Sequence, residues 1–186
     1  ASVVIISPAT DAAFAGQPDH LGRIDHACGH KIFVLFGFGV EAEIVFAVGA
    51  GEQLVGVSAW SDFPPAVRAL PQVGDAFTVD QEQLALLAAD LLLVWESGMP
   101  AHTVDELRGR GFRVESIRTR SLDDVATAMQ RIGALTGQDE AARAAVAEFR
   151  DSLDALRERY RGAAPIRVFF QISARPLFTV NREHFI

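Results

Sequence analysis

The chain lacks the features of a disulfide-bonded, membrane-spanning or nucleic-acid-binding protein. It holds a single cysteine, Cys28, so no disulfide can form within it. No apolar run reaches the roughly 18 residues that a membrane-spanning helix needs. The formal net charge is −7, and lysine and arginine form no cluster, which argues against a surface for nucleic acids. With 49% hydrophobic and 22% charged residues, the composition is that of a globular protein.

Common signatures of nucleotide binding and of serine hydrolysis are also absent. The sequence has no G-x-x-x-x-G-K-[ST] loop, no G-x-G-x-x-G before a helix and no G-x-S-x-G elbow. Their absence removes the usual signals for a nucleotide-binding protein or an α/β-hydrolase.

Two short apolar runs mark the centre of the predicted fold. Leu54–Val57 and Leu91–Val94 are continuously apolar rather than alternating, which predicts strands that are buried on both faces. Further strands are predicted at 32–36 and 113–117, and helical patterns lie between the strands, as at 80–89. This alternation predicts an α/β fold, a Rossmann-like lobe with a parallel sheet and right-handed crossovers.

The most regular pattern of the chain runs from Gln138 to Arg161. Apolar residues recur there at spacings of three and four, which predicts one long helix with a single apolar stripe. The stripe consists of Ala142, Val146, Phe149, Leu153, Leu156 and Tyr160. Ser121, followed three residues later by Asp124, predicts the start of the preceding helix. After the long helix, Ile166–Ile172 predicts a new buried strand.

Both tryptophans of the chain stand at the end of a predicted strand. Trp60 follows the first apolar run, and Trp95 ends the second, each beside small or polar residues. In an open α/β sheet, loops at the carboxyl ends of the strands form the ligand crevice. The pair therefore favours a shared aromatic-lined site, with burial in the core as the alternative for either side chain.

The order of motifs in this region resembles a known family. VGVSAW is followed by SDFPP, LPQVGD and DLLLVWESGMP. Together they resemble the periplasmic substrate-binding proteins of the helical-backbone metal-receptor type. Within that family the chain is most similar to the cobalamin-binding members, with siderophore and haem binders as near relatives. The resemblance extends from Glu43 to Ile186.

The resemblance implies two α/β lobes joined by a long, rigid backbone helix. We expect an N-terminal lobe over residues 1–120 and backbone helices over 121–163. Residues 164–186 would then begin a second lobe, most of which is missing from the chain.

The same resemblance implies which residues face the ligand. Trp60, Phe77 and Trp95 match aromatic positions of the cobalamin binders, and Phe178 would be the contribution of the second lobe. Phe63, in the double-proline turn, is a further candidate, with a structural role in that turn as its alternative. Flat aromatic faces suit a large macrocycle with an apolar rim.

Glu82 is a candidate of another kind. It matches an exposed carboxylate with which family members meet arginines of the membrane permease. Its alternative role is that of a carboxylate favoured by the dipole at a helix N-terminus.

On this basis we expect the solute-binding component of an ABC importer rather than an enzyme. It would bind cobalamin or a related corrinoid between two lobes and deliver it to a permease in the inner membrane. We expect it in the periplasm, or outside the cell and associated with the membrane. It would need no catalytic group and no cofactor, because cobalamin is the transported ligand. A ferric siderophore or haem is the alternative ligand on the same fold.

A cluster near the N-terminus supports a rival hypothesis. On a strand, His26, Cys28 and His30 would share one face, and imidazole and thiolate are zinc ligands. His20 or Asp25 would add the fourth ligand. A metal-binding protein built on this cluster is therefore the second alternative. A folded first lobe that binds nothing is the third.

The first fifteen residues allow two interpretations. They are apolar and end in Ala-Phe-Ala, as the end of a signal segment does, but they lack its basic region. A first strand at Val3–Ile6 is the preferred interpretation.

Overall fold

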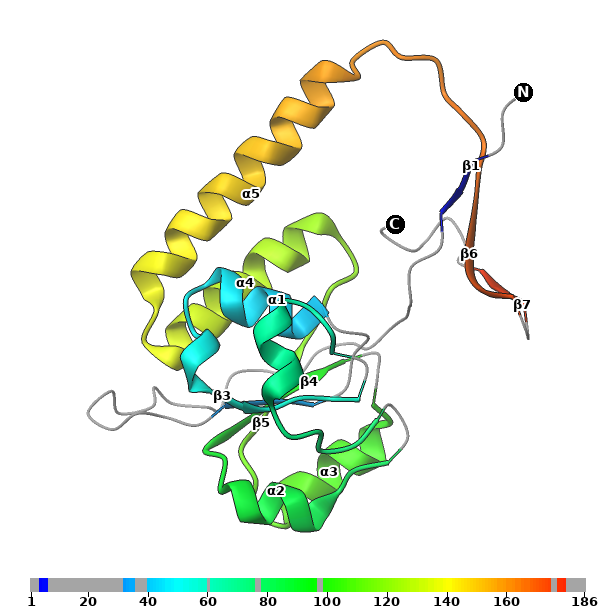
Figure 1. Ribbon diagram of the computed structural model, residues 1–186. Helices are drawn as coiled ribbons and strands as arrows, with labels where there is room; N and C mark the ends of the chain where they lie inside the picture. The colour runs from blue at the N-terminus through cyan, green and yellow to red at the C-terminus, as the bar shows by residue number, and fades with distance from the viewer. Residues whose placement is uncertain are drawn as a thin grey trace.

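The computed structural model describes residues 4–6, 32–35, 40–59, 61–75, 78–96, 99–174 and 177–179. Its centre is a four-stranded sheet in the order β3-β2-β4-β5 (Figure 1). These strands are β2 (Ile32–Leu35), β3 (Leu54–Gly56), β4 (Leu91–Trp95) and β5 (Val114–Ile117). Every neighbouring pair in this sheet is parallel, which confirms the predicted parallel α/β lobe.

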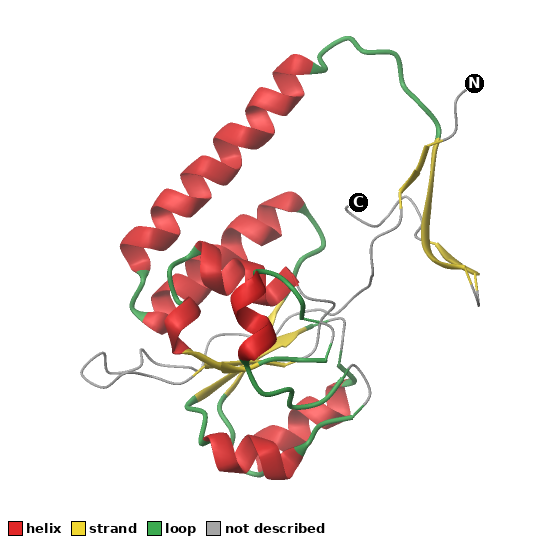
Figure 2. Ribbon diagram, in the orientation of Figure 1, coloured by secondary structure: helices red, strands yellow, loops and turns green. Residues whose placement is uncertain are grey.

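Helices cover both faces of this sheet (Figure 2). One layer contains α1 (Val40–Ala47) and α4 (Leu122–Thr136), and the other contains α2 (Gln81–Leu87) and α3 (Ala101–Gly109). Two 3₁₀ helices, η1 (Gly51–Gln53) and η2 (Pro65–Ala69), flank β3.

Strand β4 explains how one apolar run supplies two cores. Successive side chains of a strand point to opposite faces. Leu91, Leu93 and Trp95 accordingly belong to the core under α1 and α4. Leu92 and Val94 belong to the core under α2 and α3. All five are buried, which is why the run is continuously apolar rather than alternating.

Side-chain caps and a glycine set the ends of two helices. The Ser121 hydroxyl accepts a hydrogen bond from the backbone N–H of Asp124 at 3.1 Å, which confirms the predicted start of α4. That helix ends at Gly137, whose φ of 75° is favourable for glycine. The Asp80 carboxylate caps α2 by accepting from the backbone N–H of Gln83 at 2.9 Å.

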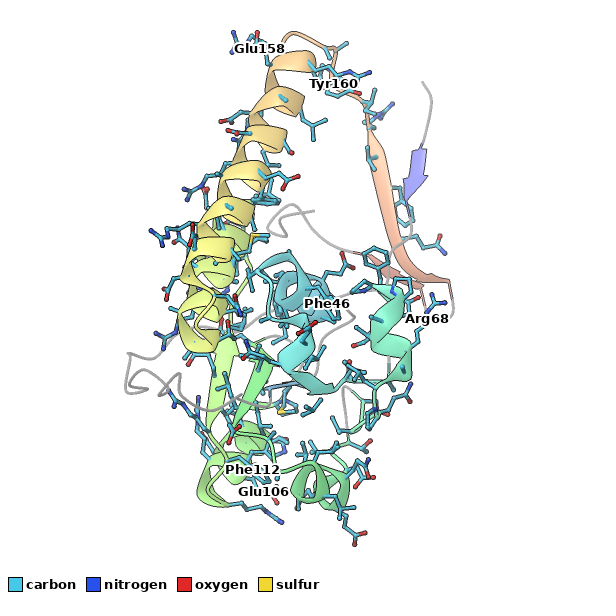
Figure 3. The ribbon with its side chains drawn as sticks, turned by 60° about the vertical axis from the view of Figure 1, so that its left-hand side comes forward. Phe46, Arg68, Glu106, Phe112, Glu158 and Tyr160 are labelled. Atoms are coloured by element: carbon cyan, nitrogen blue, oxygen red, sulfur yellow. The ribbon has the colours of Figure 1, made fainter. Side chains whose placement is uncertain are left out.

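The long helix α5 (Asp139–Arg159) packs on the lobe only along its first half. Ala142 and Val146 are buried in the same core as the inner face of α4. Farther along the predicted stripe, Leu156 is 51% exposed and Tyr160 is 58% exposed. Figure 3 shows Tyr160 and Glu158 at the end of α5 that lies away from the sheet. Helix α4 therefore packs in the core of the first lobe. The domain boundaries expected at residues 120 and 163 stay predictions.

A second, small sheet follows α5 and lies apart from the first (Figure 1). It consists of β1 (Val4–Ile6), β6 (Val168–Ala174) and β7 (Leu177–Thr179), in the order β1-β6-β7. The strands predicted at the N-terminus and after Pro165 are therefore confirmed. Strand β1 runs parallel to β6, so it belongs to the sheet after α5 rather than to the lobe assigned to 1–120.

Candidate functional site

The parallel sheet brings the loops after its strands to one edge. Because β2, β3, β4 and β5 are parallel, their carboxyl ends face the same way. The segments 57–59 and 61–64 follow β3, Glu96 follows β4, and the segment 118–120 follows β5. Helix α1 begins after β2, so its first turn lies at this edge too. We call these segments the carboxyl edge.

The turn after β3 is held by its own hydrogen bonds. The hydroxyl oxygens of Ser58 and Ser61, both buried, lie 3.1 Å apart and share a hydrogen bond. Arg68, labelled in Figure 3, donates from Nε to the carbonyl oxygen of Asp62 at 2.9 Å. On this fixed turn Phe63 keeps 55% of its surface exposed. An exposed aromatic ring on an anchored turn is ready to contact a ligand without a cost in ordering the backbone.

The segment that contains the predicted Phe77 position begins beside this turn. Ala59 donates its backbone N–H to the carbonyl oxygen of Gly74 at 2.9 Å. Asp75 donates its own N–H to the carbonyl oxygen of Thr78 at 2.9 Å, and its carboxylate accepts from the backbone N–H of Thr78 at 2.8 Å. The stretches on either side of the predicted aromatic positions are thereby joined at the carboxyl edge. Trp60 and Phe77 themselves lie outside the described residues.

Trp95 and Glu96 end the strand in the middle of the edge. Trp95 is 9% exposed and packs in the core under α1 and α4. Glu96 is 5% exposed, and its backbone N–H donates to the carbonyl oxygen of Ile117 at 2.8 Å. The ring of Trp95 is therefore mostly in contact with protein. A ligand-facing role for it stays a prediction.

Two carboxylates belong to the same edge. Glu43 lies near the start of α1, and Asp62 lies in the turn after β3. Partial burial, together with a smaller effect of the negative charge of Asp62, raises the pKa of the Glu43 carboxyl above its usual 4.5. The edge therefore favours the uncharged form of Glu43 more than open solvent does.

Sequence reasoning missed a cationic segment at this edge. Arg118 and Arg120 follow β5 and are exposed. Between them the Oγ1 atom of Thr119 is buried, with no hydrogen-bond partner among the described residues. The signal was two arginines directly after a predicted strand. Its relevance depends on β5 lying next to β4, which the sequence pattern does not specify.

The remaining candidates are distributed over the molecule or lie outside its described part. Glu82 is exposed in the first turn of α2. Phe178 lies in β7, paired with Ser173, and not in the four-stranded parallel sheet.

The proposed metal ligands His26, Cys28 and His30 fall outside the described residues. Within the described part of the chain, no group of three or more His, Cys, Asp or Glu side chains could hold a metal ion. No helix there is long and apolar enough to span a membrane.

Comparison with protein families gives a match that covers most of the chain. The family described as "Periplasmic binding protein" matches residues 38–179. That range includes the carboxyl-edge segments after β3, β4 and β5, together with α5 and most of the second sheet.

Known proteins of similar sequence and structure agree with this match. The vitamin B12-binding protein of Vibrio cholerae serotype O1 is 34% identical over 142 residues, which cover 76% of this chain and 51% of that protein. The crystal structure of the periplasmic vitamin B12 binding protein of Vibrio cholerae superimposes with a TM-score of 0.75 at 32% identity, covering 83% of this chain and 60% of that one. A periplasmic heme binding protein from Pseudomonas aeruginosa gives a TM-score of 0.61 at 27% identity, with 71% and 49% covered. The chain spans about half the length of the curated relatives that it matches.

Proposed function

The chain belongs to the family of periplasmic binding proteins, and we propose that it forms a lobe that binds cobalamin or a related corrinoid for delivery to the membrane permease of an ABC importer. Similarity to vitamin B12-binding proteins supports the ligand class. The relatives are named as binding proteins, which supports binding without catalysis in the periplasm. The ligand is cargo in this proposal, so no resident cofactor is required.

The observation that carries the proposal is the exposed ring of Phe63 at the carboxyl edge. The hydrogen bonds around Ser58, Ser61 and Arg68 hold its turn, and 55% of its side chain faces solvent. A flat apolar ring that is fixed in position before binding suits the rim of a macrocycle, because stacking buries a large area at a small entropic cost. Trp60 and Phe77, by their positions in the sequence, would extend this aromatic surface.

The permease would meet a different part of the lobe. Glu82 is exposed on α2, and no hydrogen bond or ion pair occupies its side chain within the described part of the chain. A free carboxylate on a rigid helix can pair with an arginine of a partner. We assign docking to Glu82 and ligand contact to the carboxyl edge.

The ligand is tested by isothermal titration of the chain with cyanocobalamin. We expect Phe63→Ala and Trp60→Ala each to weaken binding about tenfold or more, since each removes a stacking surface. Tyr160→Ala is the matched control, because Tyr160 is similarly exposed at the far end of α5. Equal affinity of Phe63→Ala and the control would remove Phe63 from the site. A chain that does not bind cyanocobalamin at all would overturn the ligand assignment.

Haem is the second candidate ligand, and Arg118 and Arg120 are the specific observation in its favour. Guanidinium groups suit the carboxylates of haem or an anionic siderophore, and the Pseudomonas aeruginosa heme binding protein shares the fold. Substituting both arginines with glutamine would then lower the affinity for haem and leave cyanocobalamin binding unchanged. Haem binding that withstands both substitutions would count against this alternative.

A further inference from the structure

A single peptide bond at the carboxyl edge brings an acid, an aromatic ring and a guanidinium together. Arg68, on η2, donates from Nε to the carbonyl oxygen of Asp62 at 2.9 Å (Figure 3). That carbonyl belongs to the peptide bond that joins Asp62 to Phe63. The guanidinium therefore lies against the backbone directly beside the ring that we propose as the stacking surface. All three side chains are exposed.

The contact leaves both a donor and an acceptor for a ligand. The hydrogen bond to the backbone uses Nε, and no other hydrogen bond or ion pair of Arg68 is formed within the described part of the chain. The Nη atoms of its planar fork therefore keep their N–H donors. No hydrogen bond occupies the Asp62 carboxylate there either, and an ionised carboxylate only accepts. The turn thus presents a fixed donor and an acceptor next to an exposed ring.

Negative charge dominates this end of the carboxyl edge. Partial burial and, to a smaller extent, the charge of Asp62 raise the pKa of the Glu43 carboxyl, so the two acids act on one another. Arg118 and Arg120 belong to the other end, because β2 and β4 lie between β3 and β5. At about 4.8 Å per strand, the ends of β3 and β5 are roughly 14 Å apart. That separation exceeds the Debye length of about 8 Å, so the two arginines do not neutralise Asp62.

We propose that Asp62 and Arg68 make the site selective for a macrocycle whose rim carries primary carboxamides, as a corrinoid's does, over one whose rim carries carboxylates, as haem's does. A primary carboxamide has an oxygen that accepts and an NH2 group that donates. With the macrocycle stacked on Phe63, a carboxamide at its rim accepts from Nη of Arg68 and donates to the carboxylate of Asp62. A carboxylate in the same place has no proton for Asp62 and is repelled by its charge. This inference rests on the proposed function and names the chemical group by which its site distinguishes ligands.

The test compares two corrinoids by isothermal titration. Cyanocobalamin carries primary carboxamides at the rim of the corrin, whereas dicyanocobyrinic acid carries carboxylic acids there, which are ionised at neutral pH. We expect the parent chain to bind cyanocobalamin at least about tenfold more tightly than the acid. The ratio of the two affinities is the quantity to follow in the variants.

The two substitutions should shift this ratio in opposite directions. Asp62→Asn keeps an accepting oxygen but removes the charge, so it should lower the preference for cyanocobalamin about tenfold, chiefly because the acid binds better. Arg68→Met should weaken cyanocobalamin binding about tenfold and weaken binding of the acid more, because a guanidinium attracts a carboxylate more strongly than an amide. Arg68→Met should therefore raise the ratio. Residues that only hold the turn would change both affinities by the same factor.

Asp105→Asn and Arg108→Met are the matched controls, both on α3. Arg108 also binds a backbone carbonyl, donating from Nη2 to the oxygen of Val114 at 3.3 Å, and Asp105 is an exposed carboxylate beside it. Val114 begins β5, so these side chains lie at the amino ends of the strands, opposite to the carboxyl edge. Both variants should keep the ratio of the parent. Circular dichroism establishes that all variants are folded.

The outcomes separate this inference from the proposed function. If the chain binds cyanocobalamin but Asp62→Asn and Arg68→Met leave its preference unchanged, selection of carboxamides by these residues is overturned and the corrinoid assignment stands. Equal affinity of the parent for the two corrinoids would have the same consequence. A parent chain that binds haem but neither corrinoid would contradict the proposed function and this inference with it.

Discussion

The Nε atom of Arg131 on α4 lies 2.5 Å from Oε1 of Glu115 on β5, and Nη2 of the same arginine lies 3.4 Å from Oε2. The two side chains are 31% and 13% exposed, so water screens this pair less than a surface pair such as Arg157 with Asp154, at 64% and 71%. The two-point contact fixes the edge strand of the parallel sheet to the helix that covers it.

Replacing Arg131 with methionine should lower the free energy of unfolding by about 1–3 kcal/mol, because the mostly buried Glu115 carboxylate loses its guanidinium partner. Arg157→Met, which breaks an exposed pair, should change it by no more than about 0.5 kcal/mol. Urea unfolding followed by circular dichroism measures both values. Adding Glu115→Gln to Arg131→Met should recover part of the loss. Equal stabilities of the two single variants would show that the Arg131–Glu115 pair contributes no more to the free energy of unfolding than the exposed Arg157–Asp154 pair does.

Close packing of α4 on α5 leads to a second prediction. A Cβ atom added at Gly133 would overlap the Cβ of Ala142 on α5, and it would lie 3.2 Å from the carbonyl oxygen of Gln138. Gly133→Ala should therefore cost about 1–3 kcal/mol in unfolding free energy, despite the higher helix propensity of alanine. Gly109→Ala, at the end of α3 with nothing within 4 Å of the added atom, is the control and should be neutral or stabilising. A Gly133→Ala variant as stable as this control would mean that α4 and α5 move apart to make room for the added methyl group without any loss of stability.

The strands and helices of the first lobe could be predicted because their signals are local. The continuous apolar run of β4 reflects burial on two faces, and the cap at Ser121 depends on residues three apart. The partner of β1 could not be predicted. Strand β1 pairs with β6, more than 150 residues along the chain, and a short apolar strand carries no information about which distant edge it joins.

The candidate site was predictable in outline, since loops after parallel strands converge at one edge in any such sheet. The exposure of individual side chains at this edge was not predictable from the sequence. Phe63 and Trp95 both stand near a strand end in the sequence, yet one is 55% exposed and the other 9%. The difference arises from helices α1 and α4, which cover Trp95 from distant parts of the chain. For Trp60, Phe77, His26, Cys28 and His30 the roles stay predictions.

Acid should affect stability through Glu43. Because its pKa is raised in the folded chain, the folded state binds this proton more tightly than the unfolded state does. Glu43 therefore lowers stability as the pH rises from about 4.5 through the raised pKa. Glu43→Gln should be more stable than the parent at neutral pH by at most about 0.5 kcal/mol, since the group is partly solvated. The gain should disappear below the usual pKa of a glutamate.

Thermal unfolding at neutral and acidic pH measures this difference. Glu148→Gln, a substitution at an exposed position on α5, is the control for the loss of a carboxylate as such. A gain of Glu43→Gln that is the same at both pH values would contradict the linkage and indicate an effect of the substitution itself.

Substitutions at Trp95 and Phe63 should distinguish effects on stability from effects on ligand binding. Trp95→Ala opens a cavity in the core under α1 and α4 and should cost about 3–5 kcal/mol in unfolding free energy. Phe63→Ala removes a ring that is already 55% exposed and should cost about 1 kcal/mol or less. Chemical unfolding and cyanocobalamin titration of the same samples give both quantities.

Loss of binding in Trp95→Ala would then reflect unfolding, so Trp95→Phe, which keeps an aromatic ring in the core, is the informative variant. If Trp95→Phe remains folded and binds cyanocobalamin less tightly than the parent, the exposed 9% of Trp95 contacts the ligand. If its affinity equals that of the parent, Trp95 only packs in the core beneath the carboxyl edge, and Phe63 is the residue that faces the ligand.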